Sequence, residues 1–179
     1  GKPDRDNAMA PHGLDQSLEL PSTTHIVVVD KAGNAASMTS SIETGFGSRQ
    51  MAGGFLLNNQ LTDFSARAED DAGNPIRNRI EPWKRPRSSM APTMVFGPDG
   101  ELRMILGSPG GSRIIGYVAK TVIAMIDWQM TPQEAVSLPH FINRNGAYDL
   151  EAGTEIAELA DDLRDEGYQV NIRGLNSGL

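Results

Sequence analysis

Residues 24–41 read THIVVVDKAGNAASMTSS, and this stretch decides the fold. A β-branched run over 24–30 is followed by the turn letters KAGN and then by small alternating residues over 35–41. β-Branched residues favour strands, and a Gly-Asn pair between two such runs is a short-range hairpin signal. The pattern predicts a β-hairpin that directly follows a polar, Pro-containing stretch over 1–22.

Residues 84–107 carry the next strong signals, which indicate two strands joined by a tight turn. Residues 84–96 lead from a basic, Pro-containing loop into a strand, and ELRMILG over 101–107 is the returning strand. Between them, Pro98-Asp99-Gly100 has the residue types of a turn. Residues 53–65 add a short apolar run and then a dense cluster of amides and acids.

Helical patterns follow in the second half of the chain. SRIIGYVAKTVIAMID over 112–127 is apolar with helical spacing, and TPQEAVSLP over 131–139 places Thr131 as N-cap before a Pro at the first position. Residues 154–167 form an amphipathic pattern with Thr154 as N-cap and Gly167 as the stop. The alternating residues 168–174 predict one more strand. Segregated strands and helices of this kind indicate an α+β fold.

Composition limits the function. Of the 179 residues, 39% are hydrophobic, which is enough for a buried core, and the net charge of −7 argues against a phosphate-backbone partner, so we expect no nucleic-acid binding. The chain has no Cys, which excludes disulfides, thiolate metal sites and a Cys nucleophile. No apolar run reaches the roughly 20 residues of a membrane span. The three His residues are not paired at metal-ligand spacing, so no zinc site is expected.

Two stretches could carry chemistry. GSPGGSR over 107–113 precedes a predicted helix, and three interpretations are open. It could bind phosphate, but it lacks the Lys of a phosphate loop. Its backbone N–H groups suit an oxyanion hole equally well, and the stretch could also be a simple tight turn.

The other stretch is Thr23, at the boundary between the polar residues 1–22 and the first predicted strand. A cut between Ser22 and Thr23 would give Thr23 a free α-amine with a pKa of about 7.7–8.0, able to take the hydroxyl proton at neutral pH. Taken alone, Thr23 could equally be a residue that simply starts a strand.

Four blocks of the chain resemble the small subunit of the γ-glutamyltransferase (γ-glutamyltranspeptidase) family, in that family's order. They are STTHIVVVDKAGNAASMTSSIETGFGS (22–48), LLNNQLTDFS (56–65), KRPRSSMAPT (84–93) and GSPGGSRII (107–115). The resemblance implies the four-layer αββα sandwich of the N-terminal nucleophile hydrolases, incomplete here without a large subunit. Residues 1–22 would be a pre-cleavage linker or the tail of that large subunit, and residues 23–179 a C-terminally truncated small-subunit catalytic domain.

The resemblance also assigns roles to residues. Thr23 would be the nucleophile, released by autocatalytic cleavage after Ser22, and Ser41 would support it with a second hydroxyl. Gly110 and Gly111 would form the oxyanion hole. Five further residues would bind the substrate. The α-ammonium of the glutamyl group would be held by Glu43, Gln60 and Asp63, and its α-carboxylate by Ser88 and Ser89.

The activity implied is γ-glutamyl transfer from, or hydrolysis of, glutathione and related γ-glutamyl compounds, with an amino acid, a peptide or water as acceptor. No cofactor or metal is implied. The partner is the large subunit of the same precursor, without which the piece would be inactive, and bacterial family members are usually periplasmic or secreted. Two alternatives remain: an acylase acting on glutaryl or polyglutamate compounds, and an inactive, unprocessed homologue with a binding role. One departure is the loop over 66–78, which is charged and has no aromatic residue where some members have a Tyr-bearing lid.

Overall fold

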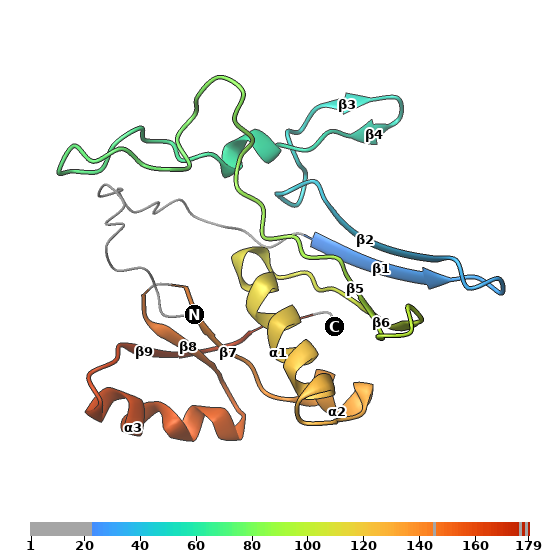
Figure 1. Ribbon diagram of the computed structural model, residues 1–179. Coiled ribbons are helices and arrows are strands. Elements are labelled where there is room, and N and C mark those ends of the chain that lie inside the picture. Colours follow the sequence, from blue (N-terminus) through green and yellow to red (C-terminus); the bar gives the residue numbers. More distant parts are fainter. Residues whose placement is uncertain (1–22, 145, 176, 178) are drawn as a thin grey trace. The chain divides into compact units, whose positions relative to one another are not determined.

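The computed structural model describes residues 23–144, 146–175, 177 and 179 (Figure 1). The described residues belong to two compact units: residues 59–88 in one, and residues 23–58 and 89–179 in the other. The predicted linker over 1–22, including Ser22, lies outside the described residues.

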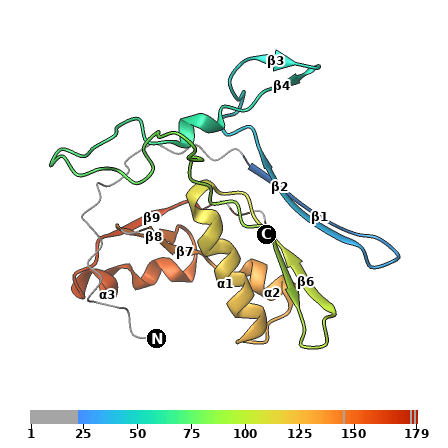
Figure 2. The ribbon, with the colours of Figure 1, turned by 45° about the horizontal axis from the view of Figure 1, so that its top comes forward.

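The larger unit begins with the predicted hairpin. Strand β1 (Thr23–Val29) pairs antiparallel with β2 (Ala35–Ser41), and the two strands form a long ribbon (Figure 2). The turn is closed by Asp30, whose Oδ1 accepts hydrogen bonds from the amides of Ala32 and Asn34 at 2.8 and 2.9 Å. Gly33 adopts φ +84°, the left-handed region that Gly occupies without strain. The hairpin prediction is confirmed.

The two faces of this hairpin differ in chemistry. Near the open end, the face that carries Thr23 and Ser41 is polar and half-buried; toward the turn the same face carries the exposed Val27 and Val29. The large side chains of the opposite face are apolar and exposed: Ile26 is 46%, Val28 56% and Met38 52% exposed. Exposed apolar groups gathered on one face of a sheet indicate a surface that another layer covers.

Two further hairpins complete the first part of the unit. Strands β3 (Met51–Ala52) and β4 (Phe55–Leu56) are joined by Gly53 and Gly54, both with positive φ as a tight two-residue hairpin requires. Strands β5 (Thr93–Phe96) and β6 (Leu102–Leu106) pair antiparallel as predicted. Their turn is closed by the Gly100 amide, which donates to the Gly97 carbonyl at 2.9 Å.

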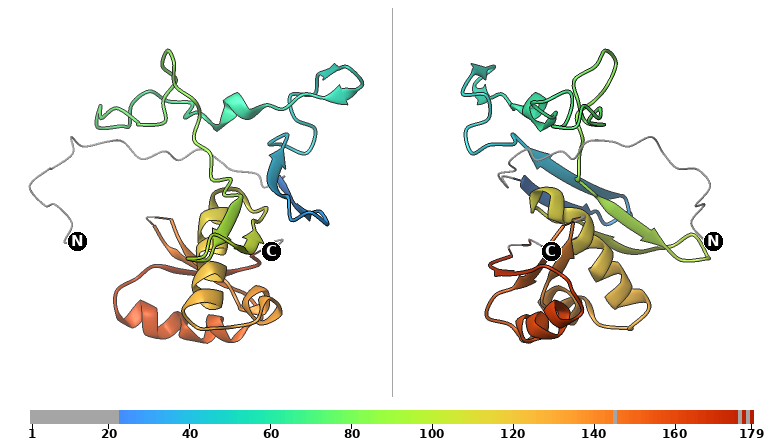
Figure 3. Two further views of the ribbon diagram at one scale, coloured as in Figure 1. Left: turned by 45° about the vertical axis from the view of Figure 1, so that its right-hand side comes forward. Right: turned by 90° about the vertical axis from the view of Figure 1, so that its left-hand side faces the viewer.

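Helix α1 (Ile114–Ile126) is the centre of the unit's packing. Its buried side contacts β6 through Leu106, Ile114 and Val118, and it contacts the three-stranded sheet through Tyr117 and Ile142 (Figure 3). Helix α2 (Pro132–Ser137) follows, and a reciprocal capping box between Thr131 and Glu134 begins it. Both helices confirm the sequence prediction.

The three-stranded sheet differs in part from expectation. Strand β8 (Tyr148–Glu151) pairs antiparallel with β7 (Phe141–Asn143) and parallel with β9 (Val170–Arg173). The sequence predicted β9 but neither β7 nor β8, which are only three and four residues long. The predicted helix over 154–167 begins as a 3-10 turn (Glu155–Leu159) before α3 (Ala160–Asp165).

Thr154 takes the N-cap position as predicted, with extended backbone angles, but its side chain makes no cap hydrogen bond. Its hydroxyl donates instead to the carbonyl of Glu151 at 2.8 Å. That bond ties the start of the helical segment back to the end of β8. Gly167 ends the helix as predicted, at φ +92°.

The smaller unit has little regular structure. Its one helical element is the 3-10 turn Gln60–Asp63, and its centre is formed by the buried side chains of Phe64, Ser65 and Ile76. The charged loop is braced at its tip by Asp70, whose Oδ1 accepts from the amides of Ala72 and Asn74.

The mixed α+β composition is therefore confirmed. The strands of the described residues form three two-stranded sheets and one three-stranded sheet, so the four-layer sandwich stays a prediction. None of the helices in the described part of the chain has the length and apolar character needed to cross a bilayer.

One buried His makes the stability of the larger unit depend on pH. His140 is 3% exposed, its ring lies 4.2 Å from that of Tyr117, and its Nε2 is 2.8 Å from the Ser177 hydroxyl. Burial lowers the pKa of His140 to about 4, and the charge of Lys120 adds to the effect. The neutral ring is therefore the form that fits the fold.

We expect acid to destabilise the protein through His140. Between pH 6.5 and 4 the unfolded chain binds a proton that the folded chain does not, so stability falls as pH falls, by at most about 1.4 kcal/mol per pH unit. Above pH 6.5 this group contributes no pH dependence. His140→Gln should flatten the fall of the melting temperature over that window, and equal slopes for both proteins would contradict the prediction.

Candidate active site

Thr23 is the first residue of β1, and Ser41 is its direct partner at the end of β2. Side chains of directly paired residues lie on the same face of a sheet, so the two hydroxyl-bearing residues are neighbours at the open end of the hairpin. The structure thus brings together the predicted nucleophile and the residue predicted to support it. The hairpin register alone produces this pairing.

Glu43 lies two residues beyond Ser41, in the turn by which the chain leaves β2. Its backbone has φ 72°, an uncommon conformation for a residue with a side chain. The Glu43 amide donates to the Ser41 hydroxyl at 2.9 Å, which stabilises this turn. Ser41 therefore connects Thr23 on one strand with Glu43 in the turn, and the third predicted site residue is held at the same end of the hairpin.

Gly110 and Gly111 lie where the chain enters the helical segment. Gly111 begins a 3-10 turn (Gly111–Arg113) that continues directly into α1, and Gly110 is its N-cap. Their φ angles are 136° and 58°, which a residue with a side chain rarely adopts. The first N–H groups of a helical segment have no partner within it, and the positive end of the helix dipole lies there. This position suits the stabilisation of a developing negative charge.

His25 connects β1 with the loop that carries these glycines. Its Nδ1 hydrogen-bonds the Thr39 hydroxyl at 2.9 Å, while the Ser37 hydroxyl lies 3.4 Å from its Nε2 and donates to the Leu106 carbonyl. Burial lowers the pKa of His25, which favours the neutral ring. The imidazole packs so closely on Gly107 that a Cβ there would lie 2.1 Å from the ring. No pattern in the sequence indicates a role for His25, because its hydrogen-bond and packing partners lie in other parts of the chain.

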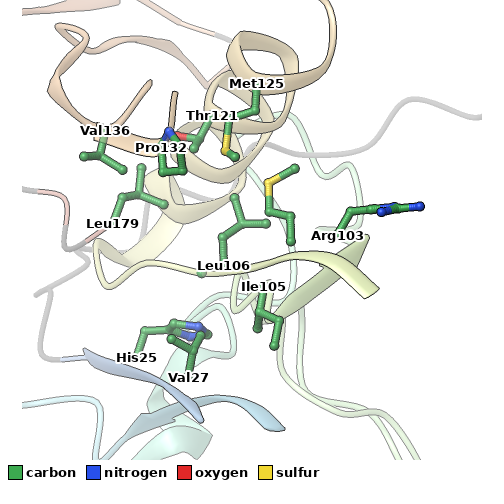
Figure 4. Close-up of a pocket in the computed structure, with 12 residues that line it drawn as sticks. His25, Val27, Arg103, Ile105, Leu106, Thr121, Met125, Pro132, Val136 and Leu179 are labelled. Carbon is green, nitrogen blue, oxygen red and sulfur yellow. The ribbon is translucent and has the colours of Figure 1, made fainter. Parts of the chain in front are cut away.

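A cavity of about 380 Å³ lies beside this contact. In Figure 4, His25 and Val27 lie on one side of the cavity, and the chain segment that carries Leu106 runs between these two residues and the helices. The remaining lining is largely apolar and includes Met125, Val136 and Leu179. No predicted site residue lines this cavity, so it is a space in the packing and not the candidate reaction centre.

Arg113 anchors the glycine turn to the three-stranded sheet. Its guanidinium contacts the Asp149 carboxylate at 2.9 Å. That carboxylate also accepts a hydrogen bond from Asn171 and forms an ion pair with Arg173, each at 3.1 Å. Burial raises the pKa of Asp149, but the hydrogen bonds of Arg113 and Asn171 and the positive charges outweigh it and hold the pKa below its usual value. Asp149 is only 4% exposed, so breaking this network would leave a buried charge unpaired.

The remaining predicted residues belong to the smaller unit or to its boundary. Gln60 and Asp63 are the first and last residues of one 3-10 turn, and the Gln60 amide donates to the Asp63 carboxylate. Ser88 is the last residue of this unit, and Ser89 belongs to the larger one. The structure therefore places Gln60 and Asp63 next to each other, and their predicted role in binding stays a prediction. In the part of the chain that the structure describes, no three His or acidic side chains converge on a common point as metal ligands would.

Comparison with known proteins identifies the family. The gamma-glutamyltranspeptidase family model matches residues 2–178. The chain is 42% identical over 147 residues to a glutathione hydrolase proenzyme of Escherichia coli, covering 76% of this chain but only 23% of that protein.

Solved structures agree with this match. A gamma-glutamyltranspeptidase variant from Helicobacter pylori is 36% identical with a TM-score of 0.72, covering 86% of this chain and 87% of the other. A gamma-glutamyltranspeptidase from Pseudomonas nitroreducens, complexed with L-DON, is 33% identical with a TM-score of 0.70, covering 86% and 84%. The chain belongs to the γ-glutamyltranspeptidase family, a family of N-terminal nucleophile hydrolases. It spans about a quarter of the length of the E. coli relative.

The contact between His25 and Gly107 gives a test of the site's framework. Gly107→Ala would place a methyl group within the His25 ring, so the hairpin and the glycine loop must separate, at a cost of about 1–3 kcal/mol for overpacking. We expect a clearly lower melting temperature. The control is Gly174→Ala, because a Cβ at Gly174 meets no atom within 4 Å. Equal melting temperatures for the two variants would show that the packing of His25 on Gly107 does not hold the site together.

Proposed function

We propose that the whole protein transfers or hydrolyses the γ-glutamyl group of glutathione and related compounds through a γ-glutamyl ester on Thr23. The observation that carries this proposal is the pairing of Thr23 with Ser41 at the open end of the hairpin, in a chain of this family. The curated relatives named glutathione hydrolase proenzyme support the same activity. The transfer and hydrolysis reactions share the first step and differ only in the acceptor.

In the proposed reaction the Thr23 hydroxyl attacks the γ-carbonyl carbon of the donor. The free α-amine of Thr23, with a reference pKa of about 7.7–8.0, accepts the hydroxyl proton. The N–H groups at Gly110 and Gly111 stabilise the resulting oxyanion, and the proton passes to the leaving amine as the C–N bond breaks. Water or an amino group then attacks the ester and restores the hydroxyl. These steps need no metal or cofactor.

Maturation uses the same hydroxyl. The Thr23 hydroxyl attacks the Ser22 carbonyl carbon in an N-to-O acyl shift, which breaks the Ser22–Thr23 amide bond and frees the α-amine. Water then hydrolyses the ester, which releases the Ser22 carboxylate and restores the hydroxyl. The word proenzyme in the names of the relatives supports a precursor that is cut into two subunits. Residues 1–22 then remain as the tail of the large subunit or as a linker.

Substrate recognition falls to charged and polar side chains. Glu43, Gln60 and Asp63 surround the α-ammonium of the donor, and Ser88 and Ser89 donate hydrogen bonds to its α-carboxylate. A carboxylate is a strong partner for an ammonium group because the hydrogen bond is charge-assisted. The adjacency of Gln60 and Asp63 in one turn supports this role, and it favours a γ-glutamyl donor over a glutaryl donor, which has no amine.

The large subunit of the same precursor is the proposed partner. The exposed apolar face of the hairpin, with Ile26, Val28 and Met38, supports the addition of a further layer, and the four-layer αββα sandwich would follow from it. The chain alone would be inactive for lack of that layer. By family resemblance we also propose that the protein is periplasmic or secreted.

Removing the Thr23 hydroxyl tests the proposal. In the whole precursor, Thr23→Ala should abolish both the cleavage after Ser22 and the hydrolysis of γ-glutamyl compounds, because one hydroxyl performs both steps. Thr23→Ser keeps a hydroxyl and should retain part of each. Denaturing gels and a γ-glutamyl anilide assay measure the two outcomes. Two subunits or normal turnover from Thr23→Ala would overturn the proposal, and Ser40→Ala, on the opposite face of the hairpin, is the matched control.

A further inference from the structure

Residues 59–88 of the smaller unit contain little regular structure, and side-chain hydrogen bonds connect several of their segments. One side chain makes two of them. The amide nitrogen of Asn78 donates to the carbonyl of Asp63 at 2.6 Å, and its amide oxygen accepts from the backbone N–H of Arg87 at 3.0 Å. The carbonyl of Asn78 also accepts from the Ser65 amide at 2.9 Å. Asn78 therefore joins the turn that ends at Asp63 to the segment that leads into Ser88.

The chemistry of these partners requires an amide at position 78. One partner is a carbonyl, which needs a donor, and the other is an N–H, which needs an acceptor. An Asp side chain of the same shape could accept from Arg87 but has no donor for Asp63. Gln offers both groups but is one methylene longer, so it would push the two segments apart.

The framework around Asn78 is fixed. Ser65 is 5% and Ile76 3% exposed, and Ser65 pairs with Arg79 in a short parallel bridge. The Arg79 amide donates to the Ile76 carbonyl at 3.1 Å, which closes the turn around Asn78. Because this turn is built on buried residues, the two ends of the Asn78 amide hold the Asp63 and Arg87 segments at a set separation.

We propose that Asn78 is a positioning residue for γ-glutamyl recognition, which sets the separation between the ammonium-binding turn at Asp63 and the carboxylate-binding serine at Ser88. This inference rests on the function proposed above. The α-ammonium and α-carboxylate of a glutamyl group are bonded to one carbon, so their binding groups must keep a fixed separation. A glutaryl donor keeps a carboxylate but has no ammonium, so it does not need both groups at once.

The test compares two donors in the processed whole protein, with active sites counted by the yield of free N-terminal Thr23. For Asn78→Ala we expect a fall of about tenfold in one ratio, that of kcat/KM for a γ-glutamyl anilide to kcat/KM for a glutaryl anilide. A tenfold change corresponds to about 1.4 kcal/mol, which is the scale of losing one or two hydrogen bonds. The fall should come mainly from KM, with cleavage after Ser22 unchanged. Asp63→Ala should lower the same ratio further.

Asn74 provides the matched control, because its side-chain amide donates to the Asp70 carboxylate at 3.1 Å, within the charged loop of the same unit. Asn74→Ala should leave the donor ratio within about twofold of wild type, since its hydrogen bond reaches neither the Asp63 turn nor Arg87. Asn78→Asp keeps the shape of the side chain and the bond to Arg87, so it provides a second variant should Asn78→Ala fail to be processed. It should also lower the ratio.

Two results would overturn the inference. One is an unchanged donor ratio in both Asn78 variants, and the other is an equal loss for both donors, which is what a merely structural residue would cause. Failure of the proposed function looks different: the wild-type protein itself would then show no preference for the γ-glutamyl donor. The wild-type measurement therefore separates the two claims.

Discussion

The antiparallel pairing of β1 with β2 is the interaction on which the rest of the site depends. Its register places Thr23 opposite Ser41, and a slip of one residue would turn the Thr23 side chain to the other face of the hairpin. The turn at Asp30 fixes that register locally, through hydrogen bonds to two amides of the same turn. A short-range turn thus determines the position of the proposed nucleophile at the far end of the hairpin.

Polar contacts then connect this hairpin end to the groups around it. His25 ties β1 to the loop that leads to Gly110 and Gly111, and the buried Arg113–Asp149 pair ties the start of α1 to the three-stranded sheet. Buried ion pairs add little net stability, but removing one partner is costly because the other charge stays buried. We therefore interpret these contacts as fixing the position of the turn at Gly110 and Gly111, the proposed oxyanion hole, and not as the main source of stability.

The sequence predicted what local chemistry determines. The hairpin, the Gly100 turn, the N-cap at Thr131 and the helical stop at Gly167 all depend on residues within a few positions of one another. Thr154 also takes the predicted N-cap position, but its hydroxyl donates to the Glu151 carbonyl and makes no cap hydrogen bond. Contacts between residues far apart in the chain could not be predicted from the sequence. Asp149 in a short strand and Asn78 in a charged loop belong to no pattern that reveals their partners.

Whether Thr23 carries the γ-glutamyl group can be measured by peptide mapping of the acyl-enzyme. The processed whole protein is mixed with a γ-glutamyl donor, quenched in acid, digested with trypsin and analysed by mass spectrometry. We expect a peptide TTHIVVVDK, residues 23–31, that carries the mass of one γ-glutamyl group. An active enzyme that yields an uncut peptide over residues 6–31, or an adduct on any other residue, would contradict it.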